Sequence, residues 1–228
     1  MIPNSKLLDT GIFDDDRYFD VEVECAKSSP EDLLIRITAS NRGPEAAPLH
    51  LLPTIWFRNT WSWANHSAKP RLALGKNDKS GRTINVKHRA YGERYLHLQN
   101  AMAVLFTENE TNTLRLYGVP GPRFCKDGIN DFVVSGRTDA LNPAQVGTKA
   151  SPHYEFLIAP HASVCTSLRL TNRTWPQLGD PLRKQEADEF YARTTPTQPS
   201  ADMQNVMRQG FSGLLWSKQF YHYVQREC

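Results

Sequence analysis

The chain has 228 residues, of which 39% are hydrophobic, 10% aromatic and 22% charged, so it is long and apolar enough for one large domain or two small ones. Its formal charge of +3 is small, and its basic residues are interspersed with acidic ones, which argues against a nucleic-acid-binding protein. No segment approaches the roughly 20 apolar residues of a membrane span. Residues 1–10 lack the features of a signal peptide, so we expect a soluble, cytoplasmic protein without a membrane partner.

The densest acidic cluster stands ahead of the first predicted strand. Asp14, Asp15 and Asp16 follow one another, and three carboxylates in a row could hold a cation or supply a general base. Adjacent carboxylates at the entrance to a strand are more often a solvated turn, because unpaired charges are rarely buried. We therefore favour a solvated turn over a site.

Short segments with alternating apolar and polar residues continue as far as Leu170. The alternation predicts strands over 18–23 and 33–38, and the break at Ser28-Ser29-Pro30 predicts that they are antiparallel neighbours. Turn-forming clusters separate the further strands that we expect, over residues 49–57, 94–98, 102–107, 114–118, 132–135, 153–158 and 164–170. Many short strands with polar turns predict a mainly β fold, with an antiparallel β-sandwich domain over residues 1–178.

The segment from Pro53 to Trp63 contains the residues most typical of a binding site, because three tryptophans lie in it with an arginine and an asparagine. Tryptophan faces stack on sugar rings, while Arg and Asn hydrogen-bond sugar hydroxyls. The predicted sugar-binding residues are therefore Arg58, Asn59, Trp61 and Trp63. The alternative is that Trp56 lies in the core and the other two tryptophans pack a loop or a domain interface, and packing is the commoner outcome for any one tryptophan.

Two helices are predicted after residue 178. Asp180 is the expected N-cap of the first, with Pro181 at its first position, and this helix should end before Pro196. Ser200 is the expected N-cap of a second, amphipathic helix that continues to Cys228. Its apolar stripe is wider than a helix lying on a sheet needs. It either covers the β domain or belongs to a larger helical domain, and if exposed it could drive self-association.

Motifs for catalysis and for cofactors are absent from the sequence. There is no HExxH, P-loop, GxGxxG or GxSxG motif, and the seven histidines do not fall at metal-ligand spacing. The four cysteines are far apart and form no CxxC pair, so we expect free thiols at Cys25, Cys125, Cys165 and Cys228. From these patterns we expect no metal and no cofactor.

Five longer motifs resemble one enzyme family. They are LLDTGIFDDDRYFDV (7–21), NRGPEAAPLHLLPTIWFRNTWSW (41–63), LFTENETN (105–112), NPAQVGTKA (142–150) and LLWSKQFYHY (214–223). The chain resembles, from Leu7 to Tyr223, the glucosidase-like proteins of glycoside hydrolase family 63. These are relatives of the processing mannosyl-oligosaccharide glucosidase and of mannosylglycerate hydrolase.

The resemblance implies a larger enzyme, in which an N-terminal β-supersandwich domain precedes an (α/α)6 barrel that contains the active site. Residues 1–178 would be part of the first domain, and residues 179–228 would be two helices that begin a truncated barrel. Such enzymes act on α-glucosides or related oligosaccharides with inversion, using two carboxyl groups about 6.5–9.5 Å apart. Because both carboxyl groups come from the barrel, we assign no catalytic acid or base in this chain, and neither Glu108 nor Glu110 receives that role.

The last residues, Val224–Cys228, depart from the family pattern, which would continue with an Asp and a Trp into the barrel. This departure predicts an inactive fragment, whose oligosaccharide substrate would bind through the missing barrel. In the larger enzyme, the loop around Trp61 would face the barrel mouth, where it would contact sugar or brace the catalytic domain. Two other classes stay open, a stand-alone carbohydrate-binding module and a structural or interaction fragment.

Overall fold

The computed structural model describes residues 7–11, 13–62, 68–78, 81–174, 178, 181–195 and 200–217. The chain divides into two compact units, Met1–Asp180 and Pro181–Cys228, and each is described by itself. The described part of the first unit contains antiparallel sheets with short helices, and that of the second contains two α-helices. The fold is therefore mainly β with C-terminal helices, as the sequence patterns predict.

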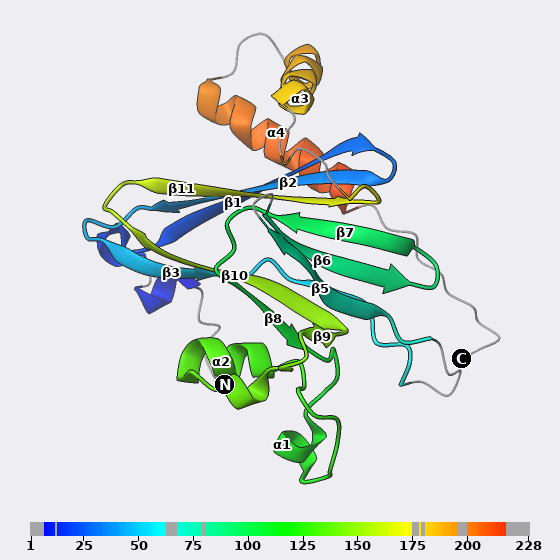
Figure 1. The fold of residues 1–228 in the computed structure, drawn as a ribbon. Coiled ribbons are helices and arrows are strands. Elements are labelled where there is room, and N and C mark those ends of the chain that lie inside the picture. Colours follow the sequence, from blue (N-terminus) through cyan, green and yellow to red (C-terminus); the bar gives the residue numbers. More distant parts are fainter. Residues whose placement is uncertain are drawn as a thin grey trace, which may run out of the picture. The chain divides into compact units, whose positions relative to one another are not determined.

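The larger sheet has seven strands. Its order is β1 (Phe19–Ser29), β2 (Asp32–Asn41), β11 (Ser163–Thr171), β7 (Gly92–Leu98), β6 (Gly81–His88), β5 (Arg71–Asp78) and β9 (Val146–Gly147). β1 and β2 form an antiparallel hairpin with Val23 opposite Ile37, which confirms the predicted neighbours. β11 pairs with both β2 and β7, so a strand late in the sequence lies between two early ones (Figure 1).

The smaller sheet is organised around the long strand β10 (Lys149–Ile158). Residues 154–158 pair with β3 (Ala47–Leu51), and residues 149–153 pair with β8 (Ala103–Thr107). β4 (Ile55–Trp56) pairs with the first two residues of β10. The single strand expected over 49–57 is thus two strands. Pro53 lies between them and has no backbone N–H for a ladder hydrogen bond.

Both sheets contribute to one hydrophobic core. Leu72, Ile84 and Leu168 enter it from the larger sheet, and Phe106 and Ala150 enter it from the smaller one, each with at most 1% of its surface exposed. Apolar burial is the main favourable contribution to folding. The loops that leave β4 and β8 therefore start from strands that the core holds in place.

Further segments differ from the predicted strands, among them the short strand β9. Residues 114–118 and 132–135 are helical, in α1 (Thr113–Tyr117) and α2 (Gly128–Ser135). β5 and β6 were not expected, although Ile84 and Val86 alternate with polar residues in β6; in β5 the run Gly75-Lys76-Asn77-Asp78 resembles a turn. Their burial comes from the neighbouring strands of the sheet, which the local sequence does not reveal.

α1 is capped at both ends, whereas α2 has a cap at its C-terminal end only. The Asn112 side chain accepts a hydrogen bond from the Arg115 backbone N–H at 3.0 Å and so caps the start of α1. Gly118 ends α1 with φ of 68°, and Gly136 ends α2 with φ of 67°. Glycine adopts this left-handed conformation without steric cost. The strand predictions are wrong here because these caps outweigh the weak strand preference of short segments.

Three 3-10 helices complete the described elements of the first unit, η1 (Leu7–Thr10), η2 (Asp14–Asp16) and η3 (Thr138–Ala140). All three aspartates of η2 are exposed. Asp15 lies 3.8 Å from the Arg17 side chain, which is itself more than half exposed. The acidic cluster is therefore a solvated turn, as favoured from the sequence.

In the second unit, α3 (Pro181–Thr194) and α4 (Ala201–Trp216) occupy the predicted positions. The Ser200 hydroxyl accepts a hydrogen bond from the Met203 backbone N–H at 3.2 Å, which confirms Ser200 as the N-cap. The Tyr191 and Ser212 hydroxyl oxygens lie 2.9 Å apart and join the two helices. The predicted N-cap Asp180 and the predicted continuation of the helix over 218–228 lie outside the described residues.

Candidate functional site

The loop that follows β4 is shaped by two asparagines. The Asn59 side-chain carbonyl accepts hydrogen bonds from the Ser62 backbone N–H at 3.2 Å and from the Ser62 hydroxyl at 2.9 Å. This is the local arrangement by which asparagine stabilises a turn. The Asn109 side chain, from the loop after β8, donates to the Phe57 carbonyl at 2.9 Å. The loop is thus closed on itself and attached to its neighbour.

Trp61 lies in a charged cluster that links three separate segments. Its indole N–H donates to Glu110 Oε1 at 2.9 Å. The Lys69 ammonium nitrogen lies 2.9 Å from the same Glu110 oxygen and 3.0 Å from Glu108 Oε2. We call Trp61, Lys69, Glu108 and Glu110 the Trp61 cluster. Because the two glutamate side chains are only 15% and 20% exposed, their charges are weakly screened by solvent.

A second layer of hydrogen bonds positions the Trp61 cluster. The Thr148 hydroxyl donates to Glu108 Oε2 at 2.8 Å and accepts from the Asn109 backbone N–H at 2.7 Å. The Thr148 backbone N–H in turn donates to the Thr107 carbonyl at 3.1 Å. Thr107 and Thr148 are both buried. The two glutamates are therefore positioned by buried residues at the place where β8 meets β9 and β10.

The electrostatics of the Trp61 cluster favour its charged form. Burial opposes ionisation of Glu110, yet hydrogen bonds from Trp61 and Lys69 outweigh burial and hold the pKa of this carboxyl below its ordinary value. Burial also disfavours a charged Lys69, but the hydrogen bonds to Glu110 and Glu108 raise the pKa of its ammonium group. An ionised Glu110 that already accepts from Trp61 and Lys69 is better suited to hold loops together than to remove a proton from a substrate.

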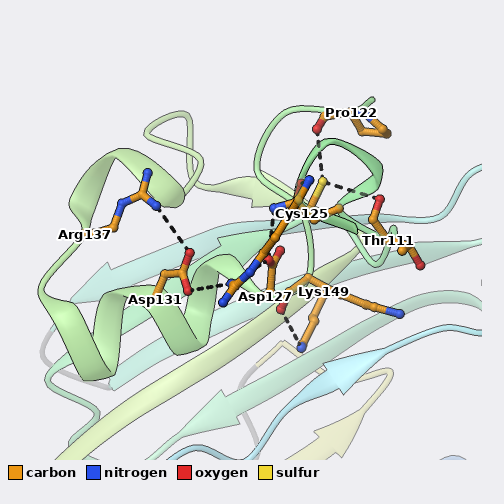
Figure 2. A network of polar contacts seen from close by, with 10 residues as sticks. Thr111, Pro122, Cys125, Asp127, Asp131, Arg137 and Lys149 are labelled. Atoms are coloured by element: carbon orange, nitrogen blue, oxygen red, sulfur yellow. Dashed lines mark hydrogen bonds and ion pairs between the residues drawn. The ribbon is translucent and has the colours of Figure 1, made fainter. Parts of the chain in front are cut away.

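A second polar cluster surrounds a cavity beside α2. The cavity has a volume of about 340 Å³, and its lining includes Cys125, Asp127, Asp131 and Arg137. The Arg137 guanidinium lies 3.5 Å from Asp131, and these two side chains face each other in Figure 2. Arg115 lies 3.2 Å from both Asp127 and Asp131. The carboxylates of this cavity are thus already paired with arginines of the same chain.

Cys125 is held as a thiol in this cavity. Its Sγ donates to the Pro122 carbonyl at 3.0 Å, as Figure 2 shows. Burial raises the pKa of the thiol, and the nearby Asp127 and Glu110 carboxylates raise it further. Because the thiolate is the nucleophilic form, this environment does not activate the residue. Cys25, Cys125 and Cys165 are all free, as expected, and Cys228 lies outside the described residues.

The chain is similar to the uncharacterized protein YMR196W of Saccharomyces cerevisiae. The two are 31% identical over an alignment 253 positions long, which covers 92% of this chain and 23% of the relative. The chain therefore spans less than a quarter of the length of the curated relative that it matches. A comparison with known protein families gives no match. Within the described ranges, no helix is long and apolar enough to cross a membrane.

The four predicted sugar-binding residues have different environments. The half-buried Trp61 has its indole N–H bound to Glu110, and the Asn59 carbonyl shapes the turn, whereas the Arg58 side chain is exposed. Trp63 lies outside the described residues. Trp56 is 55% exposed, so the alternative that placed it in the core is wrong. Asn59 and Trp61 are therefore structural parts of the loop, whatever else they contact.

The sequence did not reveal the partners of Trp61. Glu110 is 49 residues away from it along the chain, and no motif spacing connects the two. One signal was present, because Glu108 and Glu110 are two residues apart immediately after a predicted strand. Such residues share one face of an extended chain. The sequence did not indicate that Lys69 lies between the two glutamates, because Lys69 is distant from both along the chain.

Proposed function

We propose that this chain is the β-rich N-terminal part of a larger glycosidase related to glycoside hydrolase family 63, acting on α-glucosides or related oligosaccharides with inversion. The observation that carries the proposal is the series of five motifs that resembles this family from Leu7 to Tyr223. Two further facts support it. The mainly β fold is followed by helices, and the similar yeast protein is more than four times as long as the part that this chain spans.

In this proposal, the two sheets with their shared core are the family's β-supersandwich. α3 and α4 are the first helices of the (α/α)6 barrel. Met203, Val206, Leu214 and Leu215 are each more than half exposed on α4. These residues are spread around the helix, and a helix with apolar residues on more than one side is stabilised by neighbouring helices, as in a barrel. These exposed side chains support the assignment.

The catalytic acid and base would come from the barrel and not from this chain. An inverting glycosidase needs one carboxyl group to protonate the leaving oxygen and another to activate a water molecule. Glu108 and Glu110 are poor candidates, because both contact the Lys69 ammonium and each accepts a further hydrogen bond, from Thr148 and Trp61 respectively. The 228-residue chain alone should therefore have no hydrolytic activity.

The loop at the end of β4 would have a supporting role in the larger enzyme. The Trp61 cluster fixes the loop from inside, and Trp56 and Arg58 remain on its exposed side. The exposed indole of Trp56 offers a stacking face for a sugar ring or for another side chain. We propose that this side contacts the catalytic domain or a bound sugar.

The test is to express the longer protein encoded around this reading frame and to measure hydrolysis of α-linked glucose disaccharides. We expect the glucose from the non-reducing end to be released initially as the β anomer, detected by proton NMR, because inversion changes the configuration at its C1. The 228-residue chain, prepared in parallel and checked for folding by circular dichroism, should release none. A folded longer protein without activity on α-glucosides or on related oligosaccharides would contradict the proposal.

The alternative is a stand-alone carbohydrate-binding module, and the exposed Trp56 is the observation that favours it. Calorimetric titration of the 228-residue chain with glucose disaccharides distinguishes the two. Saturable binding that Trp56→Ala abolishes, in a protein without hydrolysis, would support the binding module. Activity of the longer protein without sugar binding by the short chain would support the glycosidase.

A further inference from the structure

The register of β3 and β10 brings two histidines and a glutamate to one face of the smaller sheet. His50 on β3 is directly opposite Glu155 on β10. His153 is two residues before Glu155 on the same strand, so the two share a face. Side chains opposite or diagonal on antiparallel strands are within reach of one another. His50, His153 and Glu155 therefore meet, although His50 and His153 are 103 residues apart in the chain.

The distances among the three side chains suit a common ligand. His50 Nδ1 lies 2.8 Å from His153 Nε2, and the two imidazole rings are stacked with an interplanar angle of 13°. One potential ligand atom from each of the three residues lies within 4.8 Å of the other two. In tetrahedral zinc sites the metal–nitrogen bonds of about 2.0–2.1 Å place ligand nitrogens roughly 3.3 Å apart. A small rotation of the exposed His50 ring would lengthen the distance between His50 Nδ1 and His153 Nε2 to this value.

His153 is fixed in place, whereas its two partners are accessible. His153 is 4% exposed, and the Phe132 ring of α2 packs edge-on against it with the ring centroids 5.9 Å apart. Its Nδ1 has no hydrogen-bond partner among the described residues. His153 Nε2, in contrast, points at His50 Nδ1, and a metal ion held between the two rings would replace their mutual hydrogen bond.

We propose that His50, His153 and Glu155 form a binding site for a divalent transition metal ion of the zinc class. The ligands would be His50 Nδ1, His153 Nε2 and one carboxylate oxygen of Glu155. Two imidazoles and one carboxylate are a donor set that binds Zn²⁺ and leaves a fourth position to water. The ion would connect β3 to β10 and stabilise the smaller sheet, because a ligand that binds only the folded chain shifts the equilibrium toward it.

The site does not depend on the proposed glycosidase function. It lies on strands of the smaller sheet and shares no residue with the Trp61 cluster. The expectation from the sequence was that no metal site exists, since the histidines lack ligand spacing. Ligand spacing along the chain detects only ligands that are close in sequence, whereas His50 and the other two ligands come from two strands that pair in the fold.

The experiment uses the untagged 228-residue chain and Co²⁺ as a spectroscopic probe. We expect one Co²⁺ per chain with the visible absorption of a tetrahedral site, displaced by Zn²⁺, and a higher melting temperature in Zn²⁺. His50→Ala and Glu155→Gln change exposed side chains and should fold, but the first should lose the absorption and the zinc-dependent rise in melting temperature, and the second should weaken both. His161→Asn is the matched control, because His161 is an exposed histidine in a turn with φ of 55°, a conformation that asparagine tolerates.

Three results would overturn the proposal. The first is that the folded chain shows no tetrahedral Co²⁺ absorption and no zinc-dependent change in melting temperature. The second is that His50→Ala binds the metal as the unchanged chain does, which would place the ion on other histidines. The third is that His161→Asn alone loses binding.

Discussion

Trp61 illustrates how one hydrogen bond can define the role of a side chain. Its ring has the shape for stacking on a sugar, but its N–H is committed to Glu110 at 2.9 Å. Trp61→Phe keeps an aromatic ring and removes this bond to a charged acceptor. We expect the free energy of unfolding to fall by about 1–2 kcal/mol, slightly below the usual range because Trp61 is only half-buried. Urea denaturation at neutral pH measures this loss.

The matched control for Trp61 is Trp56→Phe. The Trp56 side chain is exposed, so the same chemical change there should alter the free energy of unfolding by no more than about 0.5 kcal/mol. Equal losses for the two variants would show that the Trp61–Glu110 hydrogen bond does not contribute measurably to the free energy of unfolding. A loss confined to Trp61 would identify the indole N–H as a support of the loop.

Asp32 and Arg169 form a buried ion pair in the larger sheet. Arg169 donates to the two Asp32 carboxylate oxygens at 2.8 and 2.6 Å, and both side chains are less than 10% exposed. Asp32→Ala would leave the guanidinium buried without this partner, so we expect a loss of about 3–5 kcal/mol in urea denaturation. Asp20→Ala removes a carboxylate that pairs with Arg42 at the surface, and should change stability little.

The same pair predicts an acid-dependent loss of stability. The hydrogen bonds from Arg169 outweigh burial and hold the pKa of Asp32 below its ordinary value of 3.8. The unfolded chain therefore takes up the proton first as the pH falls. The stabilisation is complete above about pH 4 and is lost as the pH falls from there toward the lower pKa of the folded state. Asp32→Asn cannot titrate, so its free energy of unfolding should decline less steeply below about pH 4.

At the scale of elements, short-range signals identified some segments and failed for others. The Ser200 cap and the β1–β2 hairpin were predictable, because each depends on residues close together in the chain. The strands predicted over 114–118 and 132–135 are the helices α1 and α2, and the local signals for these helices are the cap residues Asn112, Gly118 and Gly136. β5 and β6 were missed, although Ile84 and Val86 alternate with polar residues in β6; the turn-forming residues of β5 obscured its strand pattern.

α4 carries two glycines that limit its stability. At Gly210 an added Cβ would meet no described atom within 4 Å. Gly210→Ala should therefore stabilise the helix by up to about 1 kcal/mol, because alanine loses less backbone entropy. Circular dichroism during thermal unfolding measures the change. Gly118→Ala is the control with the opposite sign, since its φ of 68° strains any residue with a Cβ.

At the scale of the whole molecule, the exposed apolar side chains of α4 predict association. Leu214 and Leu215 are 73% and 65% exposed, and exposed apolar side chains promote contact between chains. We expect the apparent mass in light scattering to rise with concentration. Leu214→Glu with Leu215→Glu should reduce this rise, whereas Gln209→Glu, which adds charge at an exposed polar position, should reduce it much less. A monomer at all concentrations would contradict the prediction.

The sequence by itself determined the mainly β character, the first hairpin, the positions of α3 and α4, and the solvated acidic turn. Each of these depends on residues that lie within about one turn or one strand of each other. Tertiary structure alone decided that β11 lies between β2 and β7, that Trp61 meets Glu110, and that His50 meets His153. Strand order and register set these contacts, and the core that selects them draws its side chains from strands distant in the chain.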